Sequence, residues 1–161
     1  MNIFEFAIRM ELDGEKYYSD QAKINKGNSL STVLLMLAKD EKNHADILQK
    51  KYNEASYEVI DQDLILEAKN VFKGAENFNT EVKTIPDQLD FYRMALDKEQ
   101  ESIQLYEKYY LEATDKETKD LFEYLVKQEK EHYEILDEII LLINKANEWV
   151  ESAEFGVREE Y

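Results

Sequence analysis

Hydrophobic residues recur every three or four positions along four long stretches of the chain, a spacing that places them on one face of an α-helix. We expect helices over about 2–26, 29–53, 86–113 and 116–147. Gly27 follows the first stretch, and Thr114 with Glu117 forms a capping box ahead of the fourth. Pro86, the only proline, suits the first turn of the third helix. The pattern predicts an all-α fold.

The segment 54–85 between the second and third helices is long for a connection between antiparallel neighbours, which need only a short turn. This length suits a crossover that runs along a four-helix bundle. Within it, the apolar spacing of Leu64, Ala68 and Phe72 predicts a short helix over 63–73. The pattern leaves open whether the two helical hairpins pack within one chain or are exchanged between two chains.

The end of the chain differs from the bundle in composition. We expect residues 1–147 to form the four-helix bundle and residues 148–161 to form a C-terminal tail. The tail contains Trp149, Phe155 and Tyr161, which makes it too aromatic to be fully loose. We therefore expect it to pack on the bundle or on a second subunit.

The chain repeats itself when it is shifted by 88 positions. The coinciding residues include Ala7 and Ala95, Glu11 and Glu99, Tyr18 and Tyr106, Leu37 and Leu125, Glu41 and Glu129, and His44 and His132. In each half the two glutamates lie 30 positions apart (41 − 11 and 129 − 99), centred on the turn between two helices. Residues equidistant from a tight turn lie at the same level on antiparallel helices. Each hairpin therefore brings one glutamate level with a Glu-x-x-His motif.

Six polar residues occupy the apolar seam of these helices, where leucine, isoleucine and alanine otherwise stand. A buried carboxylate without a partner loses on the order of several kcal/mol of solvation, which bound cations would offset. Four carboxylates and two neutral imidazoles balance two divalent ions, and their oxygen and nitrogen donors suit iron or manganese. One glutamate from each of two helices, with Glu-x-x-His from each of the other two, is the ligand set of di-iron bundles. The predicted ligands are Glu11, Glu41, His44, Glu99, Glu129 and His132.

Neighbouring residues have simpler interpretations. A histidine on an apolar helical face is most often a hydrogen-bonded core residue, but both histidines of this chain carry the same pattern of glutamates. Tyr18 and Tyr106 either donate hydrogen bonds to ligand carboxylates or pack in the core with satisfied hydroxyls. The nearby acids are interpreted as solvated faces: Glu15, Asp40, Glu101, Glu131 and Glu134.

Composition narrows the function further. The net charge of −16 argues against binding to nucleic acid or to an anionic membrane surface, because phosphates would be repelled. The absence of cysteine excludes disulfides, thiolate zinc sites and iron–sulfur clusters. No apolar run approaches the roughly 18 residues of a membrane span, and no secretory signal is visible at the N-terminus. We expect a cytoplasmic protein.

These motifs resemble the rubrerythrin-like branch of the ferritin-like di-iron carboxylate family. The segments 7–18 and 95–106 are similar to that family's first and third ligand helices, and 37–44 and 125–132 to its two Glu-x-x-His helices. The resemblance covers about residues 3–145 and implies a ferritin-like bundle with two iron ions, manganese or a mixed pair being the alternatives. It also implies that Glu41 and Glu129 bridge the ions while Glu11 and Glu99 bind as terminal ligands.

The chain departs from rubrerythrin proper in two features of peroxide reduction. Rubrerythrin carries an additional ligand glutamate one turn after the third-helix glutamate, where this chain has Ser102. It also carries a rubredoxin domain whose iron is held by four cysteines, and this chain has no cysteine. Electrons for any reduction must then come from an external partner.

The resemblance implies a non-haem di-iron oxidoreductase that reduces hydrogen peroxide or dioxygen, a role in oxidative stress, with an external electron donor protein. One alternative is a ferroxidase or iron-storage protein of the ferritin type. The other is a non-catalytic metal-binding or structural bundle, in the structural case with its buried carboxylates protonated or paired. We expect a homodimer.

Overall fold

The computed structural model describes residues 2–74 and 88–159, with side chains described up to residue 145. Its helices are α1 (Ile3–Ile24), α2 (Ser29–Tyr52), α3 (Leu64–Lys73), α5 (Gln88–Glu112) and α6 (Lys116–Glu159). The described residues contain no strand. The all-α prediction is therefore confirmed, including the short helix within the crossover. Pro86 lies outside the described residues.

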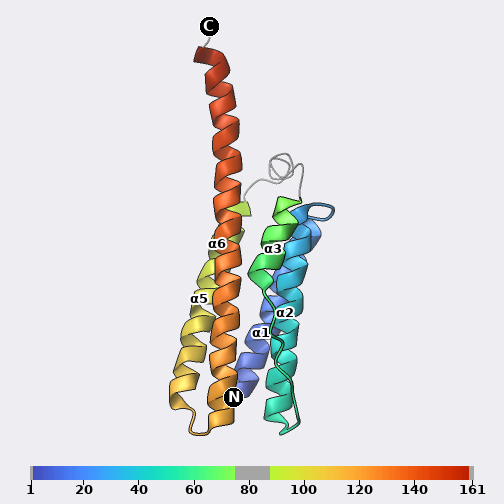
Figure 1. Cartoon of the computed structure of the whole chain (residues 1–161), viewed down its shortest axis with the longest axis vertical. Coiled ribbons are helices and arrows are strands. Elements are labelled where there is room, and N and C mark those ends of the chain that lie inside the picture. Colours follow the sequence, from blue (N-terminus) through green and yellow to red (C-terminus); the bar gives the residue numbers. More distant parts are fainter. Residues whose placement is uncertain (1, 75–87, 160–161) are drawn as a thin grey trace.

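The long helices form two antiparallel hairpins packed into one bundle. Helix α1 packs along α2, and α5 packs along α6, as Figure 1 shows. Between the hairpins, α3 lies against both α2 and α6. The crossover therefore covers one face of the bundle, on the side formed by α2 and α6. In the described residues, no helix is long and apolar enough to cross a membrane.

Side-chain caps explain where the helices begin. Asn2 accepts a hydrogen bond from the backbone N–H of Glu5, and Asn28 accepts one from Ser31. The fourth long helix differs from the prediction, because Asp115 rather than Thr114 is its cap. Asp115 Oδ2 lies 3.0 Å from the backbone N of Thr118, the third residue of α6. A carboxylate directly before the first helical residue reaches this N–H and also suits the positive end of the helix dipole.

Two apolar clusters fill the bundle, one toward each end. One contains Leu34 and Leu136, and the other contains Leu48 and Leu125. In sequence, the Glu-x-x-His motifs of α2 and α6 fall between the positions that contribute to the two clusters. The core thus consists of two apolar layers separated by a polar layer, which is held in place from both sides.

Helix α6 is longer than expected. The sequence pattern placed its end near Asn147, but the helix continues to Glu159. Beyond Asn147 the segment contains no proline and only one glycine, Gly156, so little in it opposes helix propagation. Figure 1 shows this end of α6 extending beyond the ends of the other helices. Its side chains lie outside the described ones, so packing of the tail on the bundle or a second subunit stays a prediction.

Candidate metal centre

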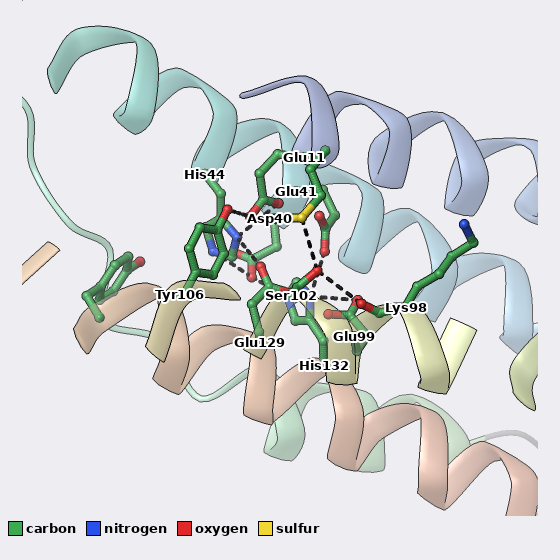
Figure 2. A network of polar contacts seen from close by, with 12 residues as sticks. Glu11, Asp40, Glu41, His44, Lys98, Glu99, Ser102, Tyr106, Glu129 and His132 are labelled. Carbon is green, nitrogen blue, oxygen red and sulfur yellow. Dashed lines mark hydrogen bonds and ion pairs between the residues drawn. The ribbon is translucent and has the colours of Figure 1, made fainter. Parts of the chain in front are cut away.

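All six residues predicted as ligands meet in the polar layer of the bundle (Figure 2). Helices α1 and α5 each contribute one glutamate, while α2 and α6 each contribute a glutamate and a histidine one turn later. Every one of the six is at most 4% exposed: Glu11, Glu41, His44, Glu99, Glu129 and His132. The sequence repeat thus corresponds to two sets of three side chains that face one another across the bundle.

Each histidine directs Nδ1 toward one glutamate of its own hairpin and one of the other. His44 Nδ1 lies 3.5 Å from Glu11 Oε2 and 3.2 Å from Glu129 Oε1. His132 Nδ1 lies 3.4 Å from Glu99 Oε1 and 2.8 Å from Glu41 Oε1. The two rings are stacked, with centroids 5.6 Å apart. The two hairpins are therefore joined at this layer by contacts between imidazole nitrogens and carboxylate oxygens.

Three overlapping groups of described side chains are compact enough to hold a metal ion: one joins Asp40 to the two histidines, and the other two contain the predicted glutamates. Of the latter two, the first consists of Glu11, His44 and Glu129, and the second of Glu41, Glu99, Glu129 and His132. In each group one ligand atom from every residue lies within 4.8 Å of the others. Glu129 belongs to both groups that contain glutamates, as a bridging carboxylate would. Glu41 belongs to the second only, so its bridging role stays a prediction.

Asp40 belongs to the centre, and the prediction that it lies on a solvated face is wrong. It is 2% exposed, and its Oδ2 lies 2.5 Å from His132 Nε2 and 3.3 Å from His44 Nε2. Gln62, in the crossover, donates a hydrogen bond to its other oxygen. One carboxylate oxygen therefore faces Nε2 of both imidazoles, whereas Nδ1 of each ring faces the glutamates. Its position four residues before His44 was the available signal, while its burial depends on the distant crossover.

The repeat is broken at Asp40, because the equivalent residue in the second half is Gln128. Gln128 is also buried, at 1% exposure, yet its Oε1 makes no hydrogen bond within the described residues. The centre therefore has one carboxylate behind two histidines instead of one behind each. Of the other acids interpreted as solvated, Glu101 and Glu134 are exposed, while Glu15 and Glu131 are half-buried.

The two tyrosines on the seam donate hydrogen bonds to glutamates of the opposite hairpin. Tyr18 Oη lies 2.5 Å from Glu99 Oε1, and Tyr106 Oη lies 2.6 Å from Glu11 Oε1. Both rings are at most 2% exposed. Of the two interpretations that the sequence allowed, hydrogen bonding to the predicted ligands is the one that the geometry supports. Each bond fixes one carboxylate oxygen and leaves the other for a different partner.

Burial and mutual charge divide the four glutamates into two kinds. Burial raises the pKa of Glu41 and Glu129 well above the usual range, and the negative charge of Glu11 raises it further. For Glu11, burial is outweighed by hydrogen bonding to Glu41 and the charge of His44, which lower its pKa to about 2. Burial of Glu99 is likewise outweighed, by Glu129 and His132, so its pKa is lowered.

Both histidines favour the protonated state when no metal is bound. Burial lowers the pKa of an imidazole, but the carboxylates around His44 and His132 outweigh it and raise both pKa values well above the usual range. Among the carboxylates, Glu11 raises the pKa of His44 most, and Glu99 raises that of His132 most. The raised pKa values of the histidines and of Glu41 and Glu129 all act to reduce the negative charge of the buried layer in the metal-free protein.

Buried carboxylate oxygens without a hydrogen bond indicate that these residues fit a bound metal. With the four glutamates ionised, Oε2 of Glu11, Glu99 and Glu129 makes no hydrogen bond within the described part of the chain. Ion pairs of the four glutamates in that part run only to the two histidines. Buried carboxylate oxygens without donors are rare in folded proteins unless they bind a cation. The donor set of oxygen and imidazole nitrogen suits iron, manganese or zinc.

A four-helix bundle with this layer of carboxylates and histidines defines the class of ferritin-like di-iron carboxylate proteins. Comparison of the sequence with known families agrees, because a sequence model of the Rubrerythrin family matches residues 2–140. The chain belongs to the Rubrerythrin family. The matched segment contains both hairpins of the bundle and all six predicted ligands. Neither the curated proteins nor the solved structures contain a match to this chain.

Proposed function

We propose that the chain binds two iron ions in this centre and acts as an oxidoreductase that reduces hydrogen peroxide or dioxygen. The observation that carries the proposal is the meeting of four buried glutamates and two histidines from four helices, with carboxylate oxygens that make no hydrogen bond within the described residues. The residues that would hold the ions are Glu11, Glu41, His44, Glu99, Glu129 and His132. When bound there, two ferrous ions would supply the two electrons needed to convert one hydrogen peroxide and two protons into two waters.

The residues around the ligands support this role by fixing donor atoms in advance. Asp40 faces Nε2 of both imidazoles, which leaves Nδ1 of each ring directed at the glutamates. Tyr18 and Tyr106 each hold one oxygen of a glutamate on α5 or α1. The six ligand side chains are themselves buried, so little of their surface faces bulk water. Re-reduction of the ions then requires an external electron donor.

A single preparation tests the proposal in two stages. Metal analysis of protein reconstituted with ferrous iron under argon should give two irons per chain. Glu41→Gln combined with Glu129→Gln should abolish this binding, while Glu67→Gln combined with Glu123→Gln, both exposed, should leave it unchanged. Stopped-flow mixing of the loaded protein with peroxide should then oxidise both irons faster than free ferrous iron.

The alternatives give different results in the same experiment. Iron loading far above two per chain, with the native mass of a large cage, would indicate storage instead of reduction. Wild-type protein that binds no metal, or metal content unaffected by the double glutamine variant, would contradict the proposed centre. Two bound irons that react with peroxide and dioxygen no faster than free iron would contradict the proposed reaction alone.

A further inference from the structure

A pocket of about 450 Å³ opens between α1 and α5 and reaches the centre. Its lining includes the exposed side chains of Arg9 and Lys98 and the buried side chains of Glu41 and Glu99. The pocket therefore joins the protein surface to two of the six predicted ligands. Figure 2 shows Lys98 and Ser102 on the α5 side of the cluster.

Two small residues at equivalent positions of the repeat line this pocket. Gly14 lies three residues after Glu11, and Ser102 lies three residues after Glu99; 102 − 14 is the repeat of 88. On a helix this spacing places each small residue one turn from its glutamate, on the same face. A small residue therefore stands in each wall of the pocket, one on α1 and one on α5.

Gly14 on α1 leaves room for Glu41, a predicted ligand on α2. A Cβ at position 14 would lie 2.7 Å from Glu41 Oε2 and 3.1 Å from its Cδ. The first distance is shorter than real Cβ contacts, so any side chain here would displace the carboxylate. Glu41 cannot yield freely, because its other oxygen lies 2.8 Å from His132 Nδ1. The position of Glu41 therefore depends on the missing side chain of Gly14.

Ser102 keeps its hydroxyl away from the ligands. Its Oγ donates to the backbone oxygen of Lys98 on its own helix, at 3.1 Å, and lies 3.5 Å from Met10 Sδ. The hydroxyl is satisfied locally and reaches no glutamate. Ser102 thus contributes to the pocket by its small size.

We propose that the pocket between α1 and α5 is the passage by which divalent metal ions reach the centre, kept open by Ser102, and that Gly14 positions Glu41 at its inner end. The inference rests on the proposed metal centre. A second observation supports it: Glu99, a buried residue of the pocket lining, has one oxygen without a hydrogen bond within the described residues. Ser102 acts on the rate of binding, and Gly14 acts on the geometry of the bound state.

The passage is tested with Co²⁺ as a probe, using its visible absorption to follow uptake and its removal by EDTA. Ser102→Leu should slow uptake and removal together by about tenfold or more, with an unchanged dissociation constant, because a barrier affects both directions alike. Ser102→Ala, which keeps the space, should have wild-type rates. If Ser102→Leu does not fold, as judged by circular dichroism, Met10→Phe narrows the same pocket from α1 and replaces it.

The outcomes separate this inference from the proposed function. Wild-type uptake and removal rates in a folded pocket-filling variant would overturn the passage while leaving the metal centre intact. Absence of Co²⁺ binding to the wild-type protein would instead refute the centre itself.

The positioning role of Gly14 is tested by the spectrum of bound Co²⁺. Gly14→Ala should shift the visible bands and weaken binding by about tenfold or more, because displacement of one ligand changes the coordination. Gly74→Ala is the matched control, since a Cβ there meets Asn70 O and Val71 O at ordinary distances of 3.5 and 3.7 Å. Shortening the displaced residue by Glu41→Asp should weaken binding less in the Gly14→Ala background than in the wild type. A wild-type spectrum and affinity for Gly14→Ala would overturn the role.

Discussion

The centre has two faces that differ in cover and in chemistry. On the side of α2 and α6, the crossover lies over the histidines and Asp40. Gln62 donates a hydrogen bond to Asp40, and Tyr124 donates one to the backbone oxygen of Ile60 at 2.7 Å. On the side of α1 and α5, the pocket opens onto Glu41 and Glu99. The closed face fixes the imidazoles, while the open face leaves carboxylates accessible. A centre that exchanges ions or reacts with small molecules needs both a fixed set of ligand atoms and an opening to solvent.

The largest expected effect is the pH dependence of metal binding, because protons compete with metal ions for ligands at both faces of the centre. The pKa values of His44 and His132 at the closed face, of Glu41 at the open face and of Glu129 between them are all raised, so these groups hold protons more tightly than free side chains do. Ligands bind metal only after losing these protons, so affinity should fall as pH falls and rise as pH rises, by more than about tenfold per pH unit. Calorimetry in buffers of different ionisation enthalpy should detect release of several protons. Binding that is independent of pH would contradict the charge balance described.

Asp40→Asn tests the closed face. The amide keeps the shape but loses the charge that holds both imidazoles, and loss of such a partner typically lowers metal affinity by about 10 to 100-fold. Competition of Co²⁺ binding against a chelator measures the change. The control is Asp46→Asn on the same helix, where the exposed carboxylate only pairs with Lys42. Equal affinities for the two variants would show that Asp40 is no part of the centre.

The sequence predicted the six ligands because its evidence for them is local and repeated. Helical spacing, the 30-residue separation around each turn and the 88-residue shift are all visible in the chain itself. Asp40 was missed because its partners His132 and Gln62, on α6 and in the crossover, meet α2 only in the folded chain. The pocket was missed for the same reason, since its walls belong to helices far apart in sequence. The cap of the fourth long helix was predicted wrongly because two adjacent residues, Thr114 and Asp115, are both of a type that caps helices.

Tyr18 and Tyr106 make equivalent hydrogen bonds, each to a glutamate of the opposite hairpin, so substituting them compares the two hairpins. Tyr18→Phe and Tyr106→Phe each remove one hydrogen bond to a buried glutamate, which should destabilise the metal-free protein by about 2 kcal/mol, and by similar amounts. Urea denaturation provides the free energy of unfolding. Tyr109→Phe is the matched control, because this buried tyrosine donates no hydrogen bond within the described residues. Losses no larger than in Tyr109→Phe would indicate that the bonds contribute little.

The smallest effect should come from weakening the contact between α6 and the crossover, which covers the closed face of the centre. Tyr124→Phe removes the bond from α6 to the crossover at Ile60, a half-exposed contact that should contribute about 1 kcal/mol or less. Hydrogen exchange of the backbone around residues 60–63 should accelerate, while the rate of Co²⁺ uptake stays as in the wild type. Faster Co²⁺ uptake in this variant would show that ions also enter through the face that we describe as closed.

Anomalous diffraction from crystals of iron-loaded protein tests the central claim most directly. We predict two anomalous peaks within the polar layer of the bundle, with Glu11 and His44 beside one and Glu99 and His132 beside the other. Glu129 should contact both, with Asp40 behind the imidazoles. An empty layer, or iron bound only at surface carboxylates, would contradict the account.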